Sequence, residues 1–347
     1  MSSASDGVRD ERRRGRSGMR EVAEKAGVAM SSVSRVMSGH PDVSPAMRAR
    51  VRAAVDELGY EPDLLAQSLR RRETLTVGFV VGDISNSLFA EIVMGVESTM
   101  HANGFAMLLT NSLGDPALEA DHIGLLSQRR VDGLVISVLD ETHPATIVRL
   151  RDLEIPVVVL DRNMPGIGVS RVLSDHRTGM QSAVLHLLDL GHRNIALILG
   201  PAVRPTLERR AGFELAFSVR DLPPTYSIYE GSFAVEHGSA AMREILDLAD
   251  PPTAVIAGGN QLMLGALRVI SDRQIDLGAE LSFIGCDDVA ITDLYQPPIA
   301  VIRRDNVEMG RAAAELLLAR MRDGAGPTDV QLPTEFVPRS SCGPPRA

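Results

Sequence analysis

The sequence has few of the features that mark secreted, disulfide-bonded, zinc-binding or membrane proteins. Its 347 residues include only two cysteines, Cys286 and Cys342, and neither belongs to a CxxC pair or a Cys/His cluster. A disulfide framework or a structural zinc site is therefore not expected. No stretch reaches the ~18 consecutive apolar residues of a membrane span. The first residues are polar and arginine-rich where a signal peptide would be apolar. We expect a cytoplasmic protein without a membrane partner.

Motifs of catalysis are also missing from the sequence. It contains no GxGxxG or Walker loop that would cradle phosphates, no GxSxG nucleophile motif and no cluster of metal ligands. The adjacent Asp287 and Asp288 could suggest paired catalytic carboxylates, but no other group completes such a site. We therefore expect neither an enzyme nor a bound cofactor or metal.

Charge is divided unevenly along the chain. The whole sequence carries a net charge of -9, which at first argues against a nucleic-acid partner. Residues 1–72, however, contain 14 Arg and Lys against 10 Asp and Glu, a net of +4, which leaves -13 for the rest. A basic N-terminal segment on an acidic body is typical of a phosphate-contacting module, although a solvated basic tail gives the same count.

Three short amphipathic patterns follow a non-periodic basic tail at residues 1–18. They cover residues 20–26, 31–37 and 44–59. The third begins with Ser44 and Pro45, which suit the cap and the first position of a helix. We predict one small helical domain over residues 19–62.

Beyond residue 74, short apolar runs alternate with amphipathic stretches. The runs lie at residues 76–81, 106–109, 133–138, 157–160, 196–199, 254–257, 281–284 and 299–302. Buried parallel strands have this texture, so we predict two doubly wound α/β halves with a cleft between them. Ligands bind outside the carboxyl ends of strands in such sheets, and closure of a cleft is a common two-state switch.

Residues 21–36 have the pattern of a helix-turn-helix. Gly27 supplies the backbone freedom of a tight turn, two alanines let the helices approach, and four valines form a shared apolar seam. In such a motif the start of the second helix meets base edges in the major groove. The side chains expected to face DNA are Met30, Ser31, Ser32, Ser34 and Arg35. A structural helical hairpin has the same pattern, so the motif alone leaves both alternatives open.

The sequence resembles LacI/GalR-family repressors in several segments. These are EVAEKAGVAMSSVSRVMSG and VSPAMRARVRAAVDELGYEPDLLAQSL, followed in order by FVVGDISN, RVDGL, DLGHRNIA, GCDD and LPTE. The resemblance covers residues 19–341 and implies an N-terminal all-α helix-turn-helix head plus an α/β core of two doubly wound parallel-sheet subdomains, like that of periplasmic binding proteins. It implies a DNA-binding transcriptional regulator, most often a repressor of metabolic genes, that a small molecule switches.

Domain boundaries follow from the motifs and the resemblance together. We expect a tail at 1–18, the head at 19–62, a hinge helix and linker at 63–74, the core at 75–341 with chain crossings near residues 173, 302 and 332, and a tail at 342–347. In the hinge, the resemblance assigns Leu69 as a wedge into the minor groove and Ala66 as the contact between two hinge helices. The alternative for this segment is a flexible linker.

The resemblance places effector contacts at eight positions. These are Phe89, Asp161, Arg162, Arg204, Arg209, Phe233, Asn260 and Asp287. The two phenylalanines could equally be core residues. The segment from Arg204 to Arg209 is one residue shorter than in the purine-responsive branch that it resembles.

The class of effector is left open by these residues. Gly258-Gly259-Asn260-Gln261 stands where sugar-responsive members have Asn-Asp, so a neutral amide replaces a carboxylate. With Arg162 and Arg209 in the same cleft, the local charge shifts toward positive and a carboxylated or phosphorylated effector becomes one alternative, because guanidinium forks suit those groups. Against this, Asp161 and Asp287 could neutralise the two arginines, and asparagine also hydrogen-bonds sugars.

A head that binds one half-site implies a homodimer on a palindromic double-stranded DNA operator. No heptad-bearing helix follows the core in this sequence, so we do not expect dimers to join in pairs. The protein would be cytoplasmic and nucleoid-associated, with a sugar, a sugar phosphate or another small metabolite as effector. A solute-binding protein of a transport system and a ligand-dependent activator are the alternatives.

Overall fold

The computed structural model describes residues 18–37, 40–60, 73–223 and 225–346. Contacts divide the chain into two compact units, residues 1–74 and 75–347. Nearly all of the expected tail and hinge, including Ala66 and Leu69, lies outside the described residues.

The N-terminal unit, here called the head, contains three described helices: α2 (Met19–Ala26), α3 (Met30–Met37) and α4 (Pro45–Leu58). The turn after α2 is made by Gly27, whose φ of 64° is the left-handed conformation that glycine adopts at no steric cost. Ser44 caps α4, because its side chain accepts the Met47 N–H at 3.3 Å. A small apolar core joins the helices and contains Val22, Ala23, Ala26, Val33, Val36, Val43, Val51, Ala54 and Tyr60.

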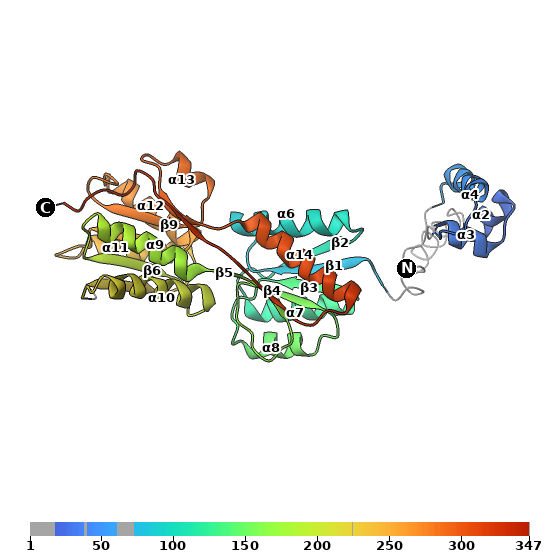
Figure 1. Ribbon diagram of the computed structural model, residues 1–347, viewed down its shortest axis with the longest axis horizontal. Helices are drawn as coiled ribbons and strands as arrows, with labels where there is room; N and C mark the ends of the chain where they lie inside the picture. The colour runs from blue at the N-terminus through green and yellow to red at the C-terminus, as the bar shows by residue number, and fades with distance from the viewer. Residues whose placement is uncertain (1–17, 38–39, 61–72, 224, 347) are drawn as a thin grey trace, which may run out of the picture. The chain divides into compact units, whose positions relative to one another are not determined.

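The second unit, here called the core, consists of two sheet-centred subdomains (Figure 1). The strands of the N-terminal subdomain are β1 (Thr76–Val81), β2 (Ala106–Asn111), β3 (Gly133–Ile136), β4 (Val157–Leu160), β5 (Ser170–Ser174) and β11 (Asp329–Leu332), in the order β11-β5-β4-β3-β1-β2. All pairings in this sheet are parallel. Its helices are α6 (Ser87–Ala102), α7 (Pro116–Gln128), α8 (Pro144–Arg151) and α14 (Asn306–Asp323).

The C-terminal subdomain repeats this plan. Its strands are β6 (Ile195–Leu199), β7 (Tyr226–Glu230), β8 (Ala254–Ala257), β9 (Ser282–Cys286), β10 (Ala300–Arg303) and β12 (Glu335–Val337), in the order β12-β10-β9-β8-β6-β7. Only β12 runs antiparallel to its neighbour. The helices are α9 (His176–Asp189), α10 (Arg204–Val219), α11 (Val235–Leu246), α12 (Asn260–Asp272) and the short α13 (Ala290–Leu294).

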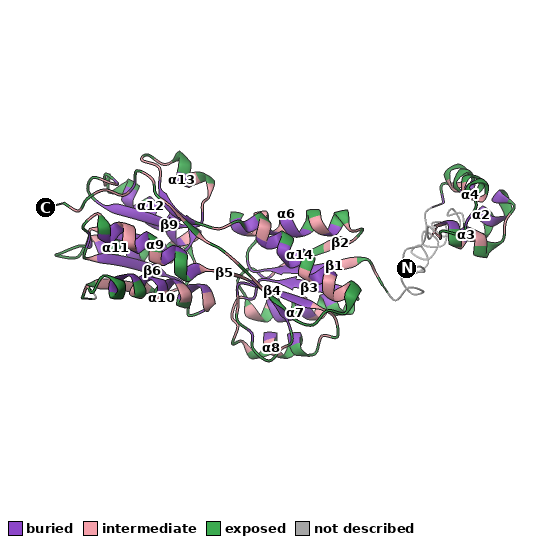
Figure 2. Ribbon diagram, in the orientation of Figure 1, coloured by how far each residue is buried: buried purple, intermediate pink, exposed green. Residues whose placement is uncertain are grey.

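Each sheet is covered on both faces by a pair of helices. One apolar cluster joins the first sheet to α6 and α14, and another joins it to α7 and α8. The second sheet packs in the same way on α11 and α12 and on α9 and α10. Figure 2 shows the resulting pattern, in which the central strands are buried and exposed residues lie on the outer helix faces. Burial on both faces explains why these strands are continuous apolar runs.

The chain passes between the subdomains three times: after β5, after β10 and after β11. The second passage delivers α14 to the first sheet, where it is seated closely on α6. A Cβ on Gly310 would lie 2.1 Å from the backbone oxygen of Ile92, so only glycine permits this approach. The polar residues at these passages therefore lie where both subdomains meet.

The segment around residue 341, where the core was expected to end, is bonded into the second sheet. Phe283 N–H donates to the Ser341 carbonyl at 2.9 Å, and Gly343 N–H donates to the Ser282 hydroxyl at 3.0 Å. His192, in the DLGHRNIA segment, contacts the Gly343 carbonyl at 2.8 Å. The first residues of the expected C-terminal tail thus pack on the C-terminal subdomain.

Candidate functional site

The helix α3 of the head has one buried and one exposed face. All five predicted DNA-facing residues lie on it: Met30, Ser31, Ser32, Ser34 and Arg35. Val33 and Val36 are buried in the head's apolar core. Met30 is 52 % exposed, Ser31 and Arg35 are exposed, and the other two serines are partly buried. The exposed face therefore includes the first residues of the helix, which is the part that enters the major groove in a helix-turn-helix.

The predicted effector residues follow the carboxyl ends of strands in both subdomains. Asp161 and Arg162 come after β4, Asp287 comes after β9, and Asn260 begins α12 after β8. Phe89 lies in the first turn of α6, Phe233 precedes α11, and Arg204 and Arg209 lie on α10. Hydrogen bonds between the subdomains show that these ends face each other, because Asn260 pairs with Asn86 and Arg204 pairs with Asp161.

Asp161 is the centre of a buried polar network. Its carboxylate accepts hydrogen bonds from Ser174 N–H at 3.1 Å, Arg204 Nη1 at 2.9 Å and Arg304 Nη1 at 2.9 Å. His176 Nε2 lies 2.6 Å from its second oxygen. Asp161 is 5 % exposed, so its charge is buried and its acceptor positions are occupied. Both subdomains supply donors to this one carboxylate.

Arg304 links the carboxylates of the two subdomains. Its Nη1 donates to Asp161, and its Nε donates to Asp287 at 2.9 Å. The Arg304 side chain is 11 % exposed, so these are buried ion pairs. Asp161 and Asp287 both have positive φ, 54° and 73°. Residues other than glycine rarely adopt this conformation, and at functional sites the surrounding structure must hold it in place.

Arg304 and His176 were not identified from the sequence as site residues. Arg304 directly follows β10, and His176 begins α9 two residues after the end of β5; both strands lead into chain passages. A polar residue at the carboxyl end of a strand is the signal that could have found them. Their partner Asp161 lies 143 residues from Arg304 in the chain, and no local pattern encodes a contact of that range.

Burial and opposite charges act against each other on the titratable groups of the network. Burial raises the pKa of the Asp161 and Asp287 carboxyls, but Arg304 and their other partners outweigh it and hold both pKa values below the usual range. Burial lowers the pKa of His176 to about 4, aided by the positive Arg209 and Arg304 and opposed by Asp161. At neutral pH, His176 is therefore neutral and its Nε2–H donates to the ionised Asp161.

Two arginines of the cleft, Arg162 and Arg209, form no ion pair within 4.0 Å among the described residues, although Asp161 acts electrostatically on Arg162 and Asp287 interacts with Arg209. Arg209 is 5 % exposed, and its Nη1 donates to the Gly258 carbonyl at 2.9 Å. The Nη1 of Arg162 donates to the backbone oxygen of Asp161 at 3.1 Å, while its buried Nε has no partner. Ser174 Oγ and Thr206 Oγ1 are also buried without a hydrogen-bond partner. The carboxylates of the cleft are thus engaged, while several donors are not.

The remaining predicted residues make other kinds of contact. Asn260 Nδ2 donates to Asn86 Oδ1 at 2.6 Å, and Asn86 Nδ2 donates back to Asn260 Oδ1 at 3.3 Å. Phe233 is partly buried against Gly200 at the end of β6, where a Cβ would lie 2.3 Å from the ring. Phe89 is partly buried against the apolar cluster of α6 and α14. Both aromatic rings therefore lie at the edge of a core.

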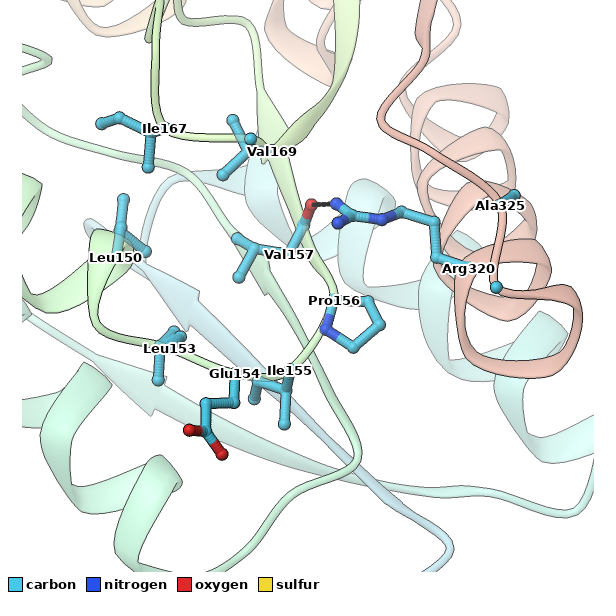
Figure 3. Close-up of a pocket in the computed structure, with 12 residues that line it drawn as sticks. Leu150, Leu153, Glu154, Ile155, Pro156, Val157, Ile167, Val169, Arg320 and Ala325 are labelled. Atoms are coloured by element: carbon cyan, nitrogen blue, oxygen red, sulfur yellow. Dashed lines mark hydrogen bonds between the residues drawn. The ribbon is translucent and has the colours of Figure 1, made fainter.

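A separate cavity of about 240 Å³ lies at the opposite end of β4. Figure 3 shows Leu150, Leu153, Val157 and Ile167 around it, and Arg320 donating to the Val157 carbonyl at 3.0 Å. Because Val157 begins β4 whereas Asp161 follows its end, this cavity is not the cleft.

Among the described residues, no group of His, Cys, Asp and Glu is suited to hold a metal, and no helix is long and apolar enough to cross a membrane.

A helix-turn-helix unit joined to two facing α/β subdomains defines the class of protein, a DNA-binding regulator with a core like that of ligand-binding proteins. Family models agree with both parts. Residues 18–63 match "Bacterial regulatory proteins, lacI family", and residues 184–342 match "Periplasmic binding protein-like domain".

Curated relatives and solved structures match almost the whole chain. The "HTH-type transcriptional repressor PurR" of Aliivibrio fischeri (strain MJ11) is 30% identical over 329 residues, which are 93% of this chain and 97% of the relative. The "Ribose operon repressor" of Escherichia coli (strain K12) is 32% identical over 307 residues, 87% and 92% of the two chains. A lac repressor dimer bound to operator and the anti-inducer ONPF is 27% identical with a TM-score of 0.83, over 94% of this chain and 99% of that chain.

The chain belongs to the lacI family of bacterial regulatory proteins. It is a DNA-binding transcriptional repressor regulated by an effector. The predicted family and fold class are confirmed. Membership of a family of transcriptional regulators also decides against the enzyme alternative.

Proposed function

We propose that this chain is a homodimeric repressor of metabolic genes that binds a palindromic operator and is switched by a small molecule in the cleft of its core. The exposed start of α3 supports the DNA-binding part, and the buried polar network between the subdomains supports the effector part. We further propose that the protein acts in the cytoplasm in association with the nucleoid, because the DNA that it would bind lies there.

On DNA, the exposed side chains at the start of α3 would read base edges. Met30 offers an apolar contact and Ser31 a hydroxyl, while Arg35 one turn later is suited to a base or a phosphate. Such short side chains contact few base positions, so a second head on the other half-site is needed for specificity. Ala66 and Leu69 would complete the contact as hinge residues in the central minor groove.

An exposed apolar surface on the N-terminal subdomain supports the dimer. Met94 on α6 is 64 % exposed, and Leu108 and Leu109 on the edge strand β2 are 41% and 40% exposed. Leu113, just after β2, is 73 % exposed. An edge strand with exposed apolar side chains is normally covered by a partner. A second copy of the chain related by two-fold symmetry would cover it.

In the cleft, an effector would act by favouring one arrangement of the two subdomains. Asn86–Asn260, Asp161–Arg204 and Asp161–Arg304–Asp287 contacts span the subdomains. A ligand that binds these groups differently in two arrangements shifts the equilibrium between them. Two structures similar to this chain are the regulator CelR in complex with cellobiose and a LacI family regulator of Enterococcus faecium with bound ribose. A sugar, a sugar phosphate or a similar metabolite is the proposed effector of this chain.

The single observation that carries the proposal is the exposed base-reading face of α3, so the test removes a side chain from it. The purified full chain is footprinted across genomic DNA from its own source, with and without candidate metabolites. We expect a short palindrome that one compound releases. Arg35→Ala should weaken operator binding by about tenfold or more, since an arginine contact to a base is worth about 1–3 kcal/mol.

Arg20→Ala is the matched control for the footprint. Arg20 is exposed on α2 and pairs with Glu24 on the same helix, so its loss should leave the operator affinity within a factor of a few. If the wild-type chain enriches no palindrome under any condition, the proposal of a palindromic operator read by α3 fails. A solute-binding role for the core then takes its place.

A further inference from the structure

The helix α10 of the C-terminal subdomain is apolar on two opposite sides. Its inner side belongs to the apolar cluster that joins α9 and α10 to the second sheet. On its outer side (Figure 2), Leu207 is 52 % exposed, Leu215 39 % and Val219 57 %. A surface helix is normally polar on the side that faces away from the core, whereas a helix that is apolar all round is normally covered all round. The outer side of α10 therefore has the composition of a contact surface.

The spacing of these side chains joins them into one ridge. Four apolar residues follow one another at intervals of four: Leu207, Ala211, Leu215 and Val219. Residues at this interval are neighbours on a helix surface, and such a row forms the ridge that packs into the grooves of a second helix. Scattered exposed apolar side chains are ordinary. On the described part of the C-terminal subdomain, however, three of the five large ones lie on α10.

Opposite charges alternate along one flank of the ridge. Arg210 and Glu214 lie one turn apart, are both partly exposed and pair with each other at 2.9 Å. Arg210 also pairs with Glu230 on the edge strand β7 at 3.0 Å. An apolar centre beside a charged and still accessible rim is the usual anatomy of a protein–protein interface.

A second copy of α10 is complementary to this surface. In an antiparallel pair of α10 helices with a two-fold axis beside Gly212, residues of the same flank that lie equally far before and after Gly212 face each other. Arg210 of each copy then faces Glu214 of the other. The four ridge residues lie 5, 1, 3 and 7 positions from Gly212, so the ridge residues of the two copies alternate along the helix axes. Neither like charges nor two large side chains are placed directly opposite each other.

We propose that α10 is a second self-association surface, on which two copies of the chain pack α10 antiparallel against α10. It differs from the proposed dimer surface, because Met94, Leu108 and Leu109 belong to the N-terminal subdomain. A chain that forms both contacts joins dimers in pairs. The sequence-based expectation against such pairing concerned a heptad-bearing helix after the core, and α10 requires no such helix.

The small size of the surface determines how strongly dimers pair. One helix face buries less than the about 800 Å² that each partner contributes to a stable interface. We therefore expect association in the micromolar range, weaker than the contact within the dimer.

The first test is sedimentation equilibrium of the full chain without DNA, from nanomolar to high micromolar concentration. The wild type should pass from two chains to four. Leu215→Glu places a carboxylate in each ridge and should raise the dissociation constant of the four-chain form at least about tenfold. Leu248→Glu is the matched control, because Leu248 is similarly exposed on the same subdomain but lies beyond α11. It should leave the association unchanged.

The second test reverses the charges on the flank. Arg210→Glu puts two carboxylates opposite each other in each half of the pair and should weaken the association about tenfold. Adding Glu214→Arg to the same chain restores opposite charges across the pair and should recover most of the affinity. A structural role of Arg210 within its own chain would instead appear as a lower unfolding midpoint, which is measured for each variant.

The third test is a disulfide cross-link at the two-fold axis. The two copies of Ala211 would lie about 3 Å apart along the helix axes, and the two copies of Val219 about 21 Å apart. Ala211→Cys should therefore form a cross-linked pair of chains with oxidised glutathione, whereas Val219→Cys should not. The unaltered chain, with Cys286 buried and Cys342 partly buried, gives the background.

Several outcomes would overturn the proposal. A wild type that stays at two chains at every concentration has no second surface. A four-chain form that survives Leu215→Glu and shows no cross-link at Ala211→Cys uses another part of the molecule. Leu109→Glu tests the two contacts separately, because it charges the proposed dimer surface on β2. Through α10, this variant should still associate two by two at micromolar concentration.

Discussion

The head and the cleft of the core place their functional groups in opposite environments. On α3, Met30, Ser31 and Arg35 are exposed beside a small apolar core that they do not enter. In the cleft, Asp161 and Asp287 are buried and bonded through Arg304. In the head, substitution of an exposed α3 residue should therefore change DNA binding with little change in stability. In the cleft, the residues proposed to respond to the ligand also stabilise the fold.

The difference follows from what each partner supplies. DNA is a large surface that meets an already folded helix, so base-reading side chains can remain in water until it arrives. A small ligand enclosed between two subdomains needs polar groups that are buried before it binds. Buried polar groups must be paired with one another to be tolerated, which produces the network around Asp161.

The largest effect on stability is expected from Arg304→Met. Removing this arginine leaves two buried carboxylates without their shared cation, and breaking a buried ion pair on one side costs about 3–5 kcal/mol. Scanning calorimetry of the full chain should show a lower midpoint for the core transition. Arg303→Met is the matched control, because the neighbouring Arg303 is half exposed and pairs with Glu335 on the surface. Its loss should change stability by about 0–1 kcal/mol, and equal effects of the two variants would contradict a network centred on Arg304.

A pH-dependent loss of core stability is the next expectation. His176 has a pKa of about 4 in the folded chain against a usual 6.5. Between these two pH values the histidine binds a proton in the unfolded chain but not in the folded chain. Above about pH 6.5 His176 is neutral in both states and does not reduce the free energy of unfolding. As the pH falls, protonation of the unfolded chain lowers that free energy, by about 2 kcal/mol at pH 5. Asp161 adds nothing in this window, because its pKa is lowered and both states stay ionised.

Urea unfolding at pH 7 and pH 5 checks this expectation. The difference between wild type and His176→Gln isolates one histidine from the other titrating groups. The stability of wild type relative to His176→Gln should fall between pH 7 and pH 5. If the relative stability is the same at both pH values, His176 does not titrate differently in the two states.

Most of the fold could be predicted from the sequence, and its gaps have a physical cause. Strands buried on both faces, such as β1, β4 and β8, are continuous apolar runs and were predicted at nearly their observed bounds. The edge strand β7 and the short β11 and β12 are partly exposed and have no such run. Their places are determined by pairing with a neighbour, which a local pattern does not record.

The site could be predicted only as a set of positions. Strand ends and family resemblance indicated Asp161, Arg209 and Asp287, but which groups pair depends on contacts across the subdomains. The sequence left open which arginines the aspartates would pair with. The structure gives their direct ion pairs to Arg204 and Arg304, while Asp161 also acts electrostatically on Arg162 and Asp287 on Arg209. These ion pairs form near the chain passages, where segments that are distant in the sequence come together.

The smallest effect is expected within the head, where two serines should behave differently. Ser44 caps α4 through its bond to Met47 N–H, so Ser44→Ala should destabilise the head by about 1 kcal/mol. Ser31, exposed in the first turn of α3, should tolerate alanine with little change in stability but weaken operator binding. Hydrogen exchange of head peptides in the full chain measures the first effect, and operator titration measures the second. If Ser31→Ala instead opened the head as Ser44→Ala does, function and stability would be joined in the head as they are in the cleft.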